Sequence, residues 1–349
     1  MPRALLIIFT LALFASTAQA QTITPGPWTL YKGTSIVQPR VDHPTDAACI
    51  EAARQMPLGT YTCRGSTKVV NVQTLPAPAL GSLELRVRAT TEQPVAADIG
   101  AFRTTCKPSH YLKDDPIVYP GKPGASHLHT FFGNTSVNAN TASLTEGAST
   151  CLGGVANRSA YWIPTMLDAG KVVQPHIALI YYKRGYALAR DTVISTLPAG
   201  LRMVASRGWH ECLFKDLGHG NGTRGAQIPA CPVGNEVWSA TTFPQCWNGK
   251  DLDSADHRSH MAYPSQGKCP ATHPVALPEI MLIAIHQSNG ASERWRLASD
   301  ANGQANGASL HADWWNGWSQ DVSDAWVKNC VQANKDCHAH LLGDGRALY

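Results

Sequence analysis

The sequence predicts a mainly β protein, with an antiparallel β-sandwich or jelly-roll-like core, long loops, a few short helices and a small N-terminal α+β unit. Three observations support this fold class. Only 15% of the 349 residues are charged, whereas glycine and proline are frequent, with 29 and 23 copies. Short β-branched and apolar runs are separated by loops rich in Gly, Pro and Asn. No sustained alternation of strands and helices is present, which argues against a parallel α/β sheet.

The first 20 residues have the pattern of a secretory signal peptide. An apolar run extends from Ala4 to Ala15, and residues 18–20 (AQA) form a small-x-small cleavage pattern. The apolar run is shorter than the roughly 20 residues that a membrane-spanning helix needs, and no later run is long enough. We therefore expect residues 1–20 to be removed, no membrane span, and a monomeric protein that is secreted or periplasmic.

Residues 22–72 are predicted to form a small separate unit, and the proline-rich residues 73–81 are typical of a linker. Because the unit is too small to be stable through its core alone, a disulfide between its two cysteines is expected to support it. Its expected elements are, in chain order, a strand at Trp28–Tyr31, a helix at Ala47–Gln55 capped by Thr45 or Asp46, and strands at Gly59–Cys63 and Thr67–Val72.

Residues 82–349 are predicted to form the main domain, in which strand-like runs alternate with long loops. The runs Lys171–Lys183 and Glu279–His286 are β-branched and apolar, which predicts buried strands. One helix is expected near the C-terminus. We expect Ser319 or Asp321 to cap its N-terminus, because the apolar residues that follow recur on one helical face.

The chain has ten cysteines, an even number, and all of them follow the predicted leader. In an exported chain such a set usually forms disulfides. No pair has the C-x-x-C spacing of a zinc ribbon or a thioredoxin-like site. Sequence alone leaves the connectivity open, but proximity along the chain favours Cys49–Cys63, Cys212–Cys231, Cys246–Cys269 and Cys330–Cys337, which leaves Cys106–Cys151.

Charge and motifs exclude several classes of function. The net charge is +4, with acidic and basic residues interspersed, so a nucleic-acid partner is not expected. The chain has no P-loop, no H-E-x-x-H metalloprotease motif, no G-x-S-x-G nucleophile elbow and no G-x-G-x-x-G after a strand.

Polar and aromatic residues concentrate in four segments of the main domain. The most informative one contains His127 and His129, which would point to the same face of a strand because they are two residues apart. The four segments are Ser126–His129, Ser159–Pro164, Cys246–Pro264 and His311–Trp318.

The order of these motifs resembles one family. The chain contains, in sequence, DPIV-x-PG, SHxH-x-FFG, SAYW-x-P, CWNGK-x-LD followed by H-x-SHMAYP, C…HPV-x-LPEI, and H-x-DWWNGW. This pattern is similar to the domain of unknown function numbered nineteen ninety-six, found in secreted fungal and bacterial proteins, and it spans roughly Phe102 to Cys330. Some members resemble fusions to carbohydrate-binding or cell-wall modules, so the resemblance implies an association with polysaccharide, without naming a reaction.

Four histidines and one carboxylate in these segments are the candidate catalytic residues. Three roles stay open for the histidines: ligands of a divalent metal through neutral imidazoles, general acids or bases, or structural loop residues bonded to the backbone. A shared site predicts that at least three of the four histidines line one pocket. The cofactor is left open, with a divalent metal as one candidate. The candidates are His127, His129, His260, His311 and Asp313.

Aromatic residues beside the polar motifs are candidates for substrate binding, because sugar rings stack on aromatic faces. The alternative is core filling, since tryptophan is bulky and mostly buried. The acidic run from Asp251 to Asp256 resembles part of a calcium loop but lacks the spacing of an EF-hand, which favours a solvated turn. The candidate binding residues are Tyr161, Trp162, Trp247, Trp314 and Lys250.

The leading hypothesis is an exported carbohydrate-active enzyme, a glycoside hydrolase or polysaccharide lyase. It would cleave a cell-wall or extracellular polysaccharide by hydrolysis or β-elimination at a histidine-centred site. Two alternatives from other classes remain. One is a non-catalytic glycan-binding or surface protein, and the other is an extracellular metal-binding protein.

Overall fold

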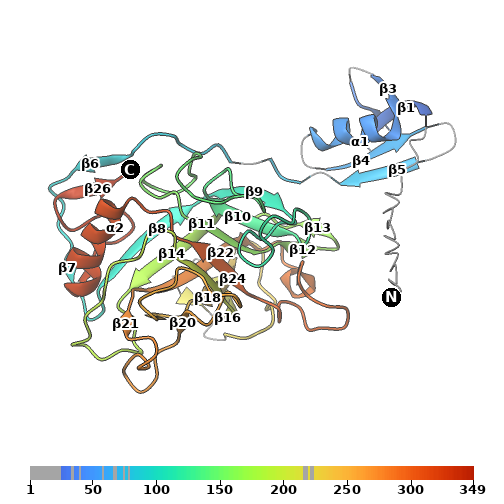
Figure 1. The fold of residues 1–349 in the computed structure, drawn as a ribbon. Helices are drawn as coiled ribbons and strands as arrows, with labels where there is room; N and C mark the ends of the chain where they lie inside the picture. Colours follow the sequence, from blue (N-terminus) through green and yellow to red (C-terminus); the bar gives the residue numbers. More distant parts are fainter. Residues whose placement is uncertain are drawn as a thin grey trace, which may run out of the picture. The chain divides into compact units, whose positions relative to one another are not determined.

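The computed structural model describes residues 25–32, 35–38, 41–56, 59–65, 69–73, 75–77, 79–214, 219–220 and 224–349. The chain divides into two compact units, Met1–Thr74 and Leu75–Tyr349, whose elements are labelled in Figure 1. The predicted signal peptide and parts of the predicted linker lie outside the described residues. Among the helices that are described, none is long and apolar enough to cross a membrane.

The N-terminal unit is one antiparallel sheet with one helix. Its helix begins where the sequence predicts, because the Thr45 side chain accepts a hydrogen bond from the Ala48 amide at 3.1 Å. Trp28, Leu30 and Tyr61 form a small buried core around the Cys49–Cys63 disulfide. The elements are β1 (Pro25–Lys32), β2 (Ser35–Ile36), β3 (Asp42–Thr45), α1 (Asp46–Arg54), β4 (Thr60–Arg64) and β5 (Val69–Gln73), with sheet order β2-β1-β4-β5 and β3 paired to β1.

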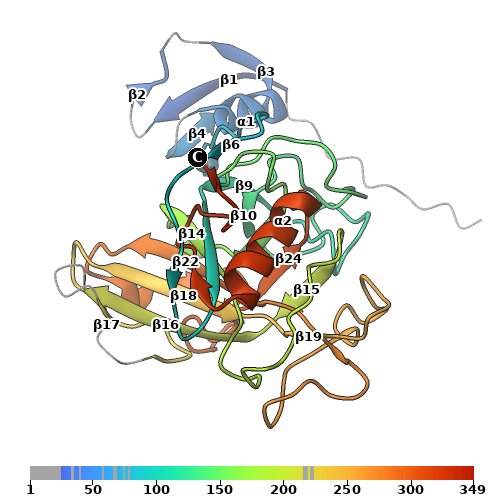
Figure 2. The same cartoon turned by 90° about the vertical axis from the view of Figure 1, so that its left-hand side faces the viewer.

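The main unit is built on two sheets, and the prediction of a mainly β, sandwich-like fold is confirmed (Figure 2). The larger, eight-stranded sheet has the order β17 (His219–Gly220), β16 (Arg207–Phe214), β18 (Glu236–Thr242), β22 (Glu279–Gln287), β14 (Ile177–Lys183), β8 (Ala101–Cys106), β25 (Lys335–Asp336) and β7 (Val95–Ala96). The smaller, five-stranded sheet has the order β15 (Arg202–Ala205), β24 (Ala312–Trp315), β11 (Ala160–Pro164), β10 (His129–Gly133) and β9 (Pro108–Leu112). All described pairs within these sheets are antiparallel except the short β25–β8 pair.

Smaller elements complete the main unit. Three of them form the sheet β13 (Lys171–Val172), β12 (Met166–Asp168) and β23 (Arg296–Leu297). Three more form β20 (Met261–Ala262), β19 (Cys246–Trp247) and β21 (Val275–Ala276), and β26 (Arg346–Leu348) pairs with β6 (Val87–Ala89). The helices are η2 (Ser292–Arg294), α2 (Gln320–Trp326) and the π-helix η3 (Val327–Gln332). The predicted C-terminal helix is confirmed and begins at Gln320, but the Ser319 side chain makes no capping hydrogen bond, and the helix changes to π geometry after Trp326.

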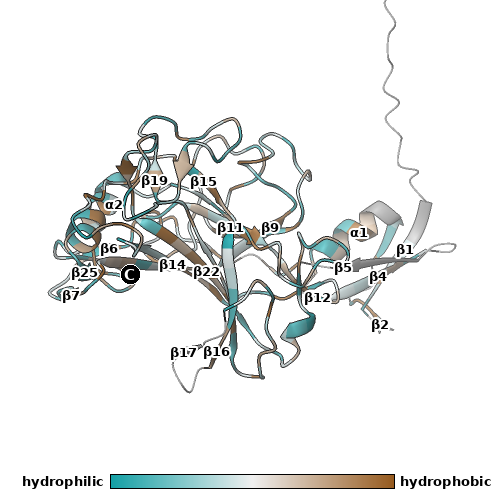
Figure 3. Cartoon of the chain, turned by 90° about the horizontal axis from the view of Figure 1, so that it is seen from below, coloured by the Kyte–Doolittle hydropathy of each residue, from teal (hydrophilic) through white to brown (hydrophobic). Residues whose placement is uncertain are grey.

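One hydrophobic core draws side chains from both sheets. Phe132 of β10 and Trp314 of β24 belong to it together with Tyr182 of β14 and Leu282 of β22. The hydrophobic colour in Figure 3 follows β14 and β22, whose apolar runs the sequence predicts as buried strands. Because side chains alternate along a strand, the neighbours of these core residues point to the outer faces of the two sheets.

The five disulfides pair as proximity along the chain favours. They join Cys49–Cys63, Cys106–Cys151, Cys212–Cys231, Cys246–Cys269 and Cys330–Cys337. Among the residues that the structure describes, no cysteine is free. A fully paired set is typical of chains that fold outside the reducing cytosol.

His286 gives the main unit a predicted sensitivity to acid. It is fully buried on β22, and neither ring nitrogen has a hydrogen-bond partner among the described residues. Burial, reinforced by His210 and His176, lowers the pKa of His286 from 6.5 to about 3. Below pH 6.5 His286 is protonated in the unfolded chain but stays neutral in the folded one. The free energy of unfolding therefore falls as the pH drops from 6.5 toward 3.

We expect His286→Leu to remove this part of the acid sensitivity. Between pH 7 and pH 4 the free energy of unfolding of the variant should fall by about 3 kcal/mol less than that of the unsubstituted protein. Urea unfolding followed by tryptophan fluorescence at the two pH values measures the difference. Equal losses in the two proteins would show that His286 is protonated in the folded state or shielded by a partner.

Candidate functional site

Strand alternation places the candidate residues on the outer face of the five-stranded sheet. On β10, Phe132 points into the core between the sheets, so His129 and Phe131 point outward. On β24, Trp314 points inward, and Asp313 therefore lies on the outer face. His127 and His311 each stand two residues before one of these positions, just ahead of the two strands.

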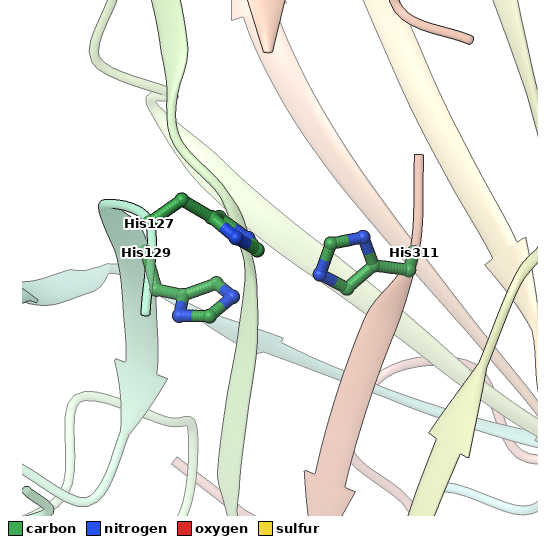
Figure 4. A group of neighbouring side chains, drawn as sticks. All are labelled: His127, His129 and His311. Atoms are coloured by element: carbon green, nitrogen blue, oxygen red, sulfur yellow. The ribbon is translucent and has the colours of Figure 1, made fainter. Parts of the chain in front are cut away.

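Three imidazoles from two distant parts of the chain converge at this face. The ring centroids of His127 and His129 lie 4.2 Å apart, and those of His127 and His311 lie 5.0 Å apart. One nitrogen of each ring lies within 4.8 Å of one nitrogen of each of the others. Figure 4 shows His311 pointing from its own strand toward the two other rings.

Backbone carbonyls fix the orientation of two of the rings. The Nδ1 atom of His129 lies 2.9 Å from the Asp114 carbonyl oxygen, and the Nδ1 atom of His311 lies 2.8 Å from the Ser309 carbonyl oxygen. A carbonyl only accepts, so Nδ1 carries the proton in both rings, and Nε2 keeps its lone pair. The Nε2 atoms of His127 and His129 are buried, with no hydrogen-bond partner in the described part of the chain.

Two carboxyl groups complete the cluster. Asp313 is fully buried, and neither of its oxygens has a hydrogen-bond partner among the described residues. Asp115 accepts hydrogen bonds from the amides of Ile117 and Val118 through one oxygen, at 3.0 and 2.9 Å. One oxygen of each carboxyl lies within 4.8 Å of a His129 nitrogen and of the other carboxyl.

Burial sets the charge state of the cluster. Desolvation first, and the neighbouring His311 second, lower the pKa of His127 to about 4. Desolvation also lowers the pKa values of His129 and His311. In the opposite direction, desolvation raises the pKa of Asp313 well above its usual value, and nearby Asp115 raises it further. At neutral pH the three imidazoles are therefore neutral, with free lone pairs.

A pocket of about 400 Å³ opens onto the cluster. His127, His311, Asp115 and Asp313 line it, while His129 lies beneath them and is fully buried. Tyr119 also lines the pocket, with 39% of its surface exposed. A substrate or a water molecule can thus contact the cluster from the pocket, while the opposite side of the cluster is buried in protein.

His260, although predicted as a catalytic residue, does not join the cluster. Its Nδ1 atom lies 2.9 Å from the Ser254 hydroxyl, and its Nε2 atom lies 2.7 Å from the Arg202 carbonyl oxygen. Both nitrogens are therefore engaged in holding the 254–260 loop against β15. The described residues that line the pocket do not include His260.

Most of the predicted substrate-binding residues lie away from the pocket. Tyr161, Trp162 and Trp314 are fully buried, so protein covers both faces of each ring. Trp247 is half-buried and donates from Nε1 to the Asp251 carbonyl oxygen at 2.7 Å, and Lys250 lies exposed in the same turn. The described lining of the pocket contains none of these five residues.

The acidic run after Lys250 forms turns, as the alternative to a calcium loop predicts. Asp256 accepts hydrogen bonds from the Ser259 amide and the Ser254 hydroxyl, which hold its pKa below the usual range. Asp253 pairs with Arg202 and His257.

Asp115 is the member of the cluster that the sequence reasoning missed. It begins the DPIV-x-PG motif, which directly precedes the motif of His127, so a signal was present in the sequence. Its position beside Asp313 depends on how the loop before β10 folds back over the sheet, which spacing alone does not reveal.

The comparison with known families agrees with the location of this cluster. The family model described as Domain of unknown function (DUF1996) matches residues 115–318, which is more than half of the chain. The match begins at Asp115 and includes all five residues of the cluster. No curated protein and no solved structure matches the chain.

Proposed function

We propose that this chain, which belongs to the DUF1996 family, is an exported enzyme that cleaves a cell-wall or extracellular polysaccharide by hydrolysis or β-elimination. The reaction would take place in the pocket lined by His127 and His311. One observation carries the proposal: three neutral imidazoles from two distant segments converge below an open polar pocket, and at least two of them keep unpaired Nε2 atoms.

The unpaired atoms favour a catalytic role over a structural one. A buried polar atom without a hydrogen bond costs about 1–3 kcal/mol of stability, and a buried carboxyl costs more if it ionises. His129 and Asp313 both carry this cost, with no compensating partner in the described residues. Costs of this kind are typical of sites that trade stability for function.

The pocket suits a hydrated, polar substrate. Its volume of about 400 Å³ lies in the range of small-molecule and substrate sites. Hydroxyl-bearing residues Ser126, Ser206 and Ser309 line it, together with Arg258 and the exposed ring of Tyr119. These groups offer hydrogen bonds to sugar hydroxyls and one aromatic face for stacking. Both hydrolysis and β-elimination need a proton acceptor at neutral pH, which a neutral imidazole can supply.

The non-catalytic alternative has less support. It relies on aromatic rings that stack on sugar, but Tyr161, Trp162 and Trp314 are enclosed by protein. A binding surface would also have no use for a fully buried, unpaired Asp313.

A screen of the mature protein on cell-wall and extracellular polysaccharides tests the proposal. We expect new reducing ends for hydrolysis, and ultraviolet absorbance of unsaturated products in addition for β-elimination. His311→Ala should abolish either signal. His273→Ala is the matched control, because His273 is a hydrogen-bonded histidine of a separate loop. Binding to a polysaccharide without any release of fragments, with and without added divalent metals, would replace this proposal with a binding function.

A further inference from the structure

We propose that His127, His129 and His311 bind one divalent transition-metal ion such as Zn²⁺, with the carboxylate of Asp313 as its counter-charge and the fourth coordination position open to the pocket. The inference deepens the proposed function and rests on it only for the reaction that the ion would serve. It stands on the positions and hydrogen bonds of the four side chains.

The histidines are prepared as metal ligands. A ligating imidazole usually donates its other nitrogen to a backbone carbonyl or a carboxylate, which fixes the ring and directs the lone pair at the ion. His129 and His311 do this through the carbonyls of Asp114 and Ser309. The burial of His127 and its contacts with both rings direct it to the same point.

The separations fit a single ion after a small adjustment. In tetrahedral zinc sites the metal–nitrogen distance is about 2.0–2.1 Å, so two ligand nitrogens lie about 3.4 Å apart. The ligand atoms of the three histidines all lie within 4.8 Å of one another. Side-chain rotations alone can close the remaining gap, because the backbone already holds the rings on one side of a common centre.

One ion, and not two, follows from the bonding of His129. Its ring belongs both to the three-histidine group and to a second group with Asp115 and Asp313. Nδ1 is occupied by the Asp114 carbonyl, so His129 offers one lone pair, on Nε2. His129 can therefore bind one ion only, which we place at the three histidines, with the carboxyl groups of the second group beside it.

Asp313 is the independent observation that indicates a cation. It is fully buried, both its oxygens lack hydrogen-bond partners in the described part of the chain, and Trp162 and Val204 stand beside it in the sheet. A carboxylate in such surroundings needs a positive charge next to it. Arg258 lines the same pocket but forms no ion pair with Asp313, and no other Lys or Arg of the described residues does so, which leaves an ion held by the imidazoles as its counter-charge.

The donor set selects the class of metal. Calcium and magnesium prefer oxygen ligands, and copper(I) prefers thiolate or thioether sulfur. Three imidazole nitrogens with a carboxylate suit zinc and other divalent first-row metals. The pocket leaves one side of the centre open, which is the arrangement of catalytic zinc sites and not of structural ones.

Isothermal titration calorimetry of Zn²⁺ into the chelator-treated mature protein, produced without a histidine tag, tests the inference. We expect about one equivalent of zinc to bind, and a rise in melting temperature when it does. His129→Gln and Asp313→Asn should each weaken binding by about 100-fold. The matched control is His110→Gln, because His110 lies on the neighbouring strand with both nitrogens hydrogen-bonded.

The outcomes separate the metal from the reaction. Absence of zinc binding, or affinity unchanged in both cluster variants, would overturn the metal inference, and sugar release by the same protein would leave the proposed function standing. Zinc binding that the cluster variants lose, without sugar release from any polysaccharide, would support the metal centre and contradict the proposed function. Circular dichroism of each variant distinguishes the loss of zinc binding from unfolding. If one of the two cluster variants fails to fold, the other still tests the inference.

Discussion

His129→Ala should abolish the release of sugar fragments while the protein still binds its polysaccharide. His129 lies at the centre of the cluster, because it belongs to both groups of potential ligands and its Nε2 atom has no hydrogen-bond partner among the described residues. A group that acts mainly in the transition state reduces turnover more than binding when it is removed. We expect turnover to fall on the order of 10³-fold, with the Michaelis constant changed much less.

Two variants make this prediction specific. His129→Gln keeps a donor for the Asp114 carbonyl but removes the imidazole, so it should lose activity while the loop before β10 stays in place. His110→Gln should keep most of the activity, because the His110 ring stacks on Phe131 and bonds to the Val137 carbonyl without reaching the pocket. Equal activity in His129→Gln and the unsubstituted protein would contradict the histidine-centred site.

Asp313→Leu should stabilise the metal-free protein while it removes activity. The carboxyl is buried without a hydrogen-bond partner among the described residues, between apolar neighbours on the outer face of the sheet. Replacing it by an apolar side chain of similar size removes the cost of burying a polar group, about 1–3 kcal/mol. Stability and activity would therefore change in opposite directions, as expected for a residue kept for function.

Urea unfolding of the chelator-treated protein at pH 7 measures the change in stability, and the sugar-release assay measures the loss of activity. Met203→Leu serves as a control for the substitution itself, because Met203 is buried on the opposite face of β15, away from the cluster. If Asp313→Leu instead lowered the free energy of unfolding by about 1–3 kcal/mol, Asp313 would be stabilised by favourable contacts in the metal-free protein. The proposal that it balances the charge of a bound cation would then be wrong.

Local patterns were sufficient for much of the fold. The Thr45 side chain caps α1 because Thr, Ser, Asp and Asn can bond the free amides of a first helical turn, and this is visible in the sequence. The apolar run Glu279–His286 predicts a buried strand, and β22 covers it. The disulfides followed from proximity because most of the pairs close short loops, such as Cys330–Cys337.

The roles of the aromatic residues could not be read from the chain. Tyr161 and Trp162 alternate on β11, so one points into the core between the sheets and the other points to the outer face. The outer ring would be available to a sugar if that face were bare. It is buried because Ile117, Val137 and Leu144 of the loops around β10 cover it. Such a cover arises from tertiary packing and leaves no periodic signal in the sequence.

The histidines show the same division. The i, i+2 spacing predicted that His127 and His129 lie on one face of a strand; their ring centroids do lie 4.2 Å apart, but β10 begins only at His129, so His127 belongs to the loop before it. The exclusion of His260 depends on two hydrogen bonds to Ser254 and Arg202, one of them between distant segments. The addition of Asp115 likewise depends on a loop that folds back to Asp313.

The most direct test of the metal centre is a crystal structure of the mature protein soaked with Zn²⁺, with anomalous diffraction recorded on both sides of the zinc absorption edge. The account predicts one strong zinc peak about 2.0–2.1 Å from Nε2 of His129, with His127 and His311 as the other protein ligands and Asp313 beside it as the counter-charge. Absence of a peak at that position, or a zinc ion bound only by other residues, would contradict it.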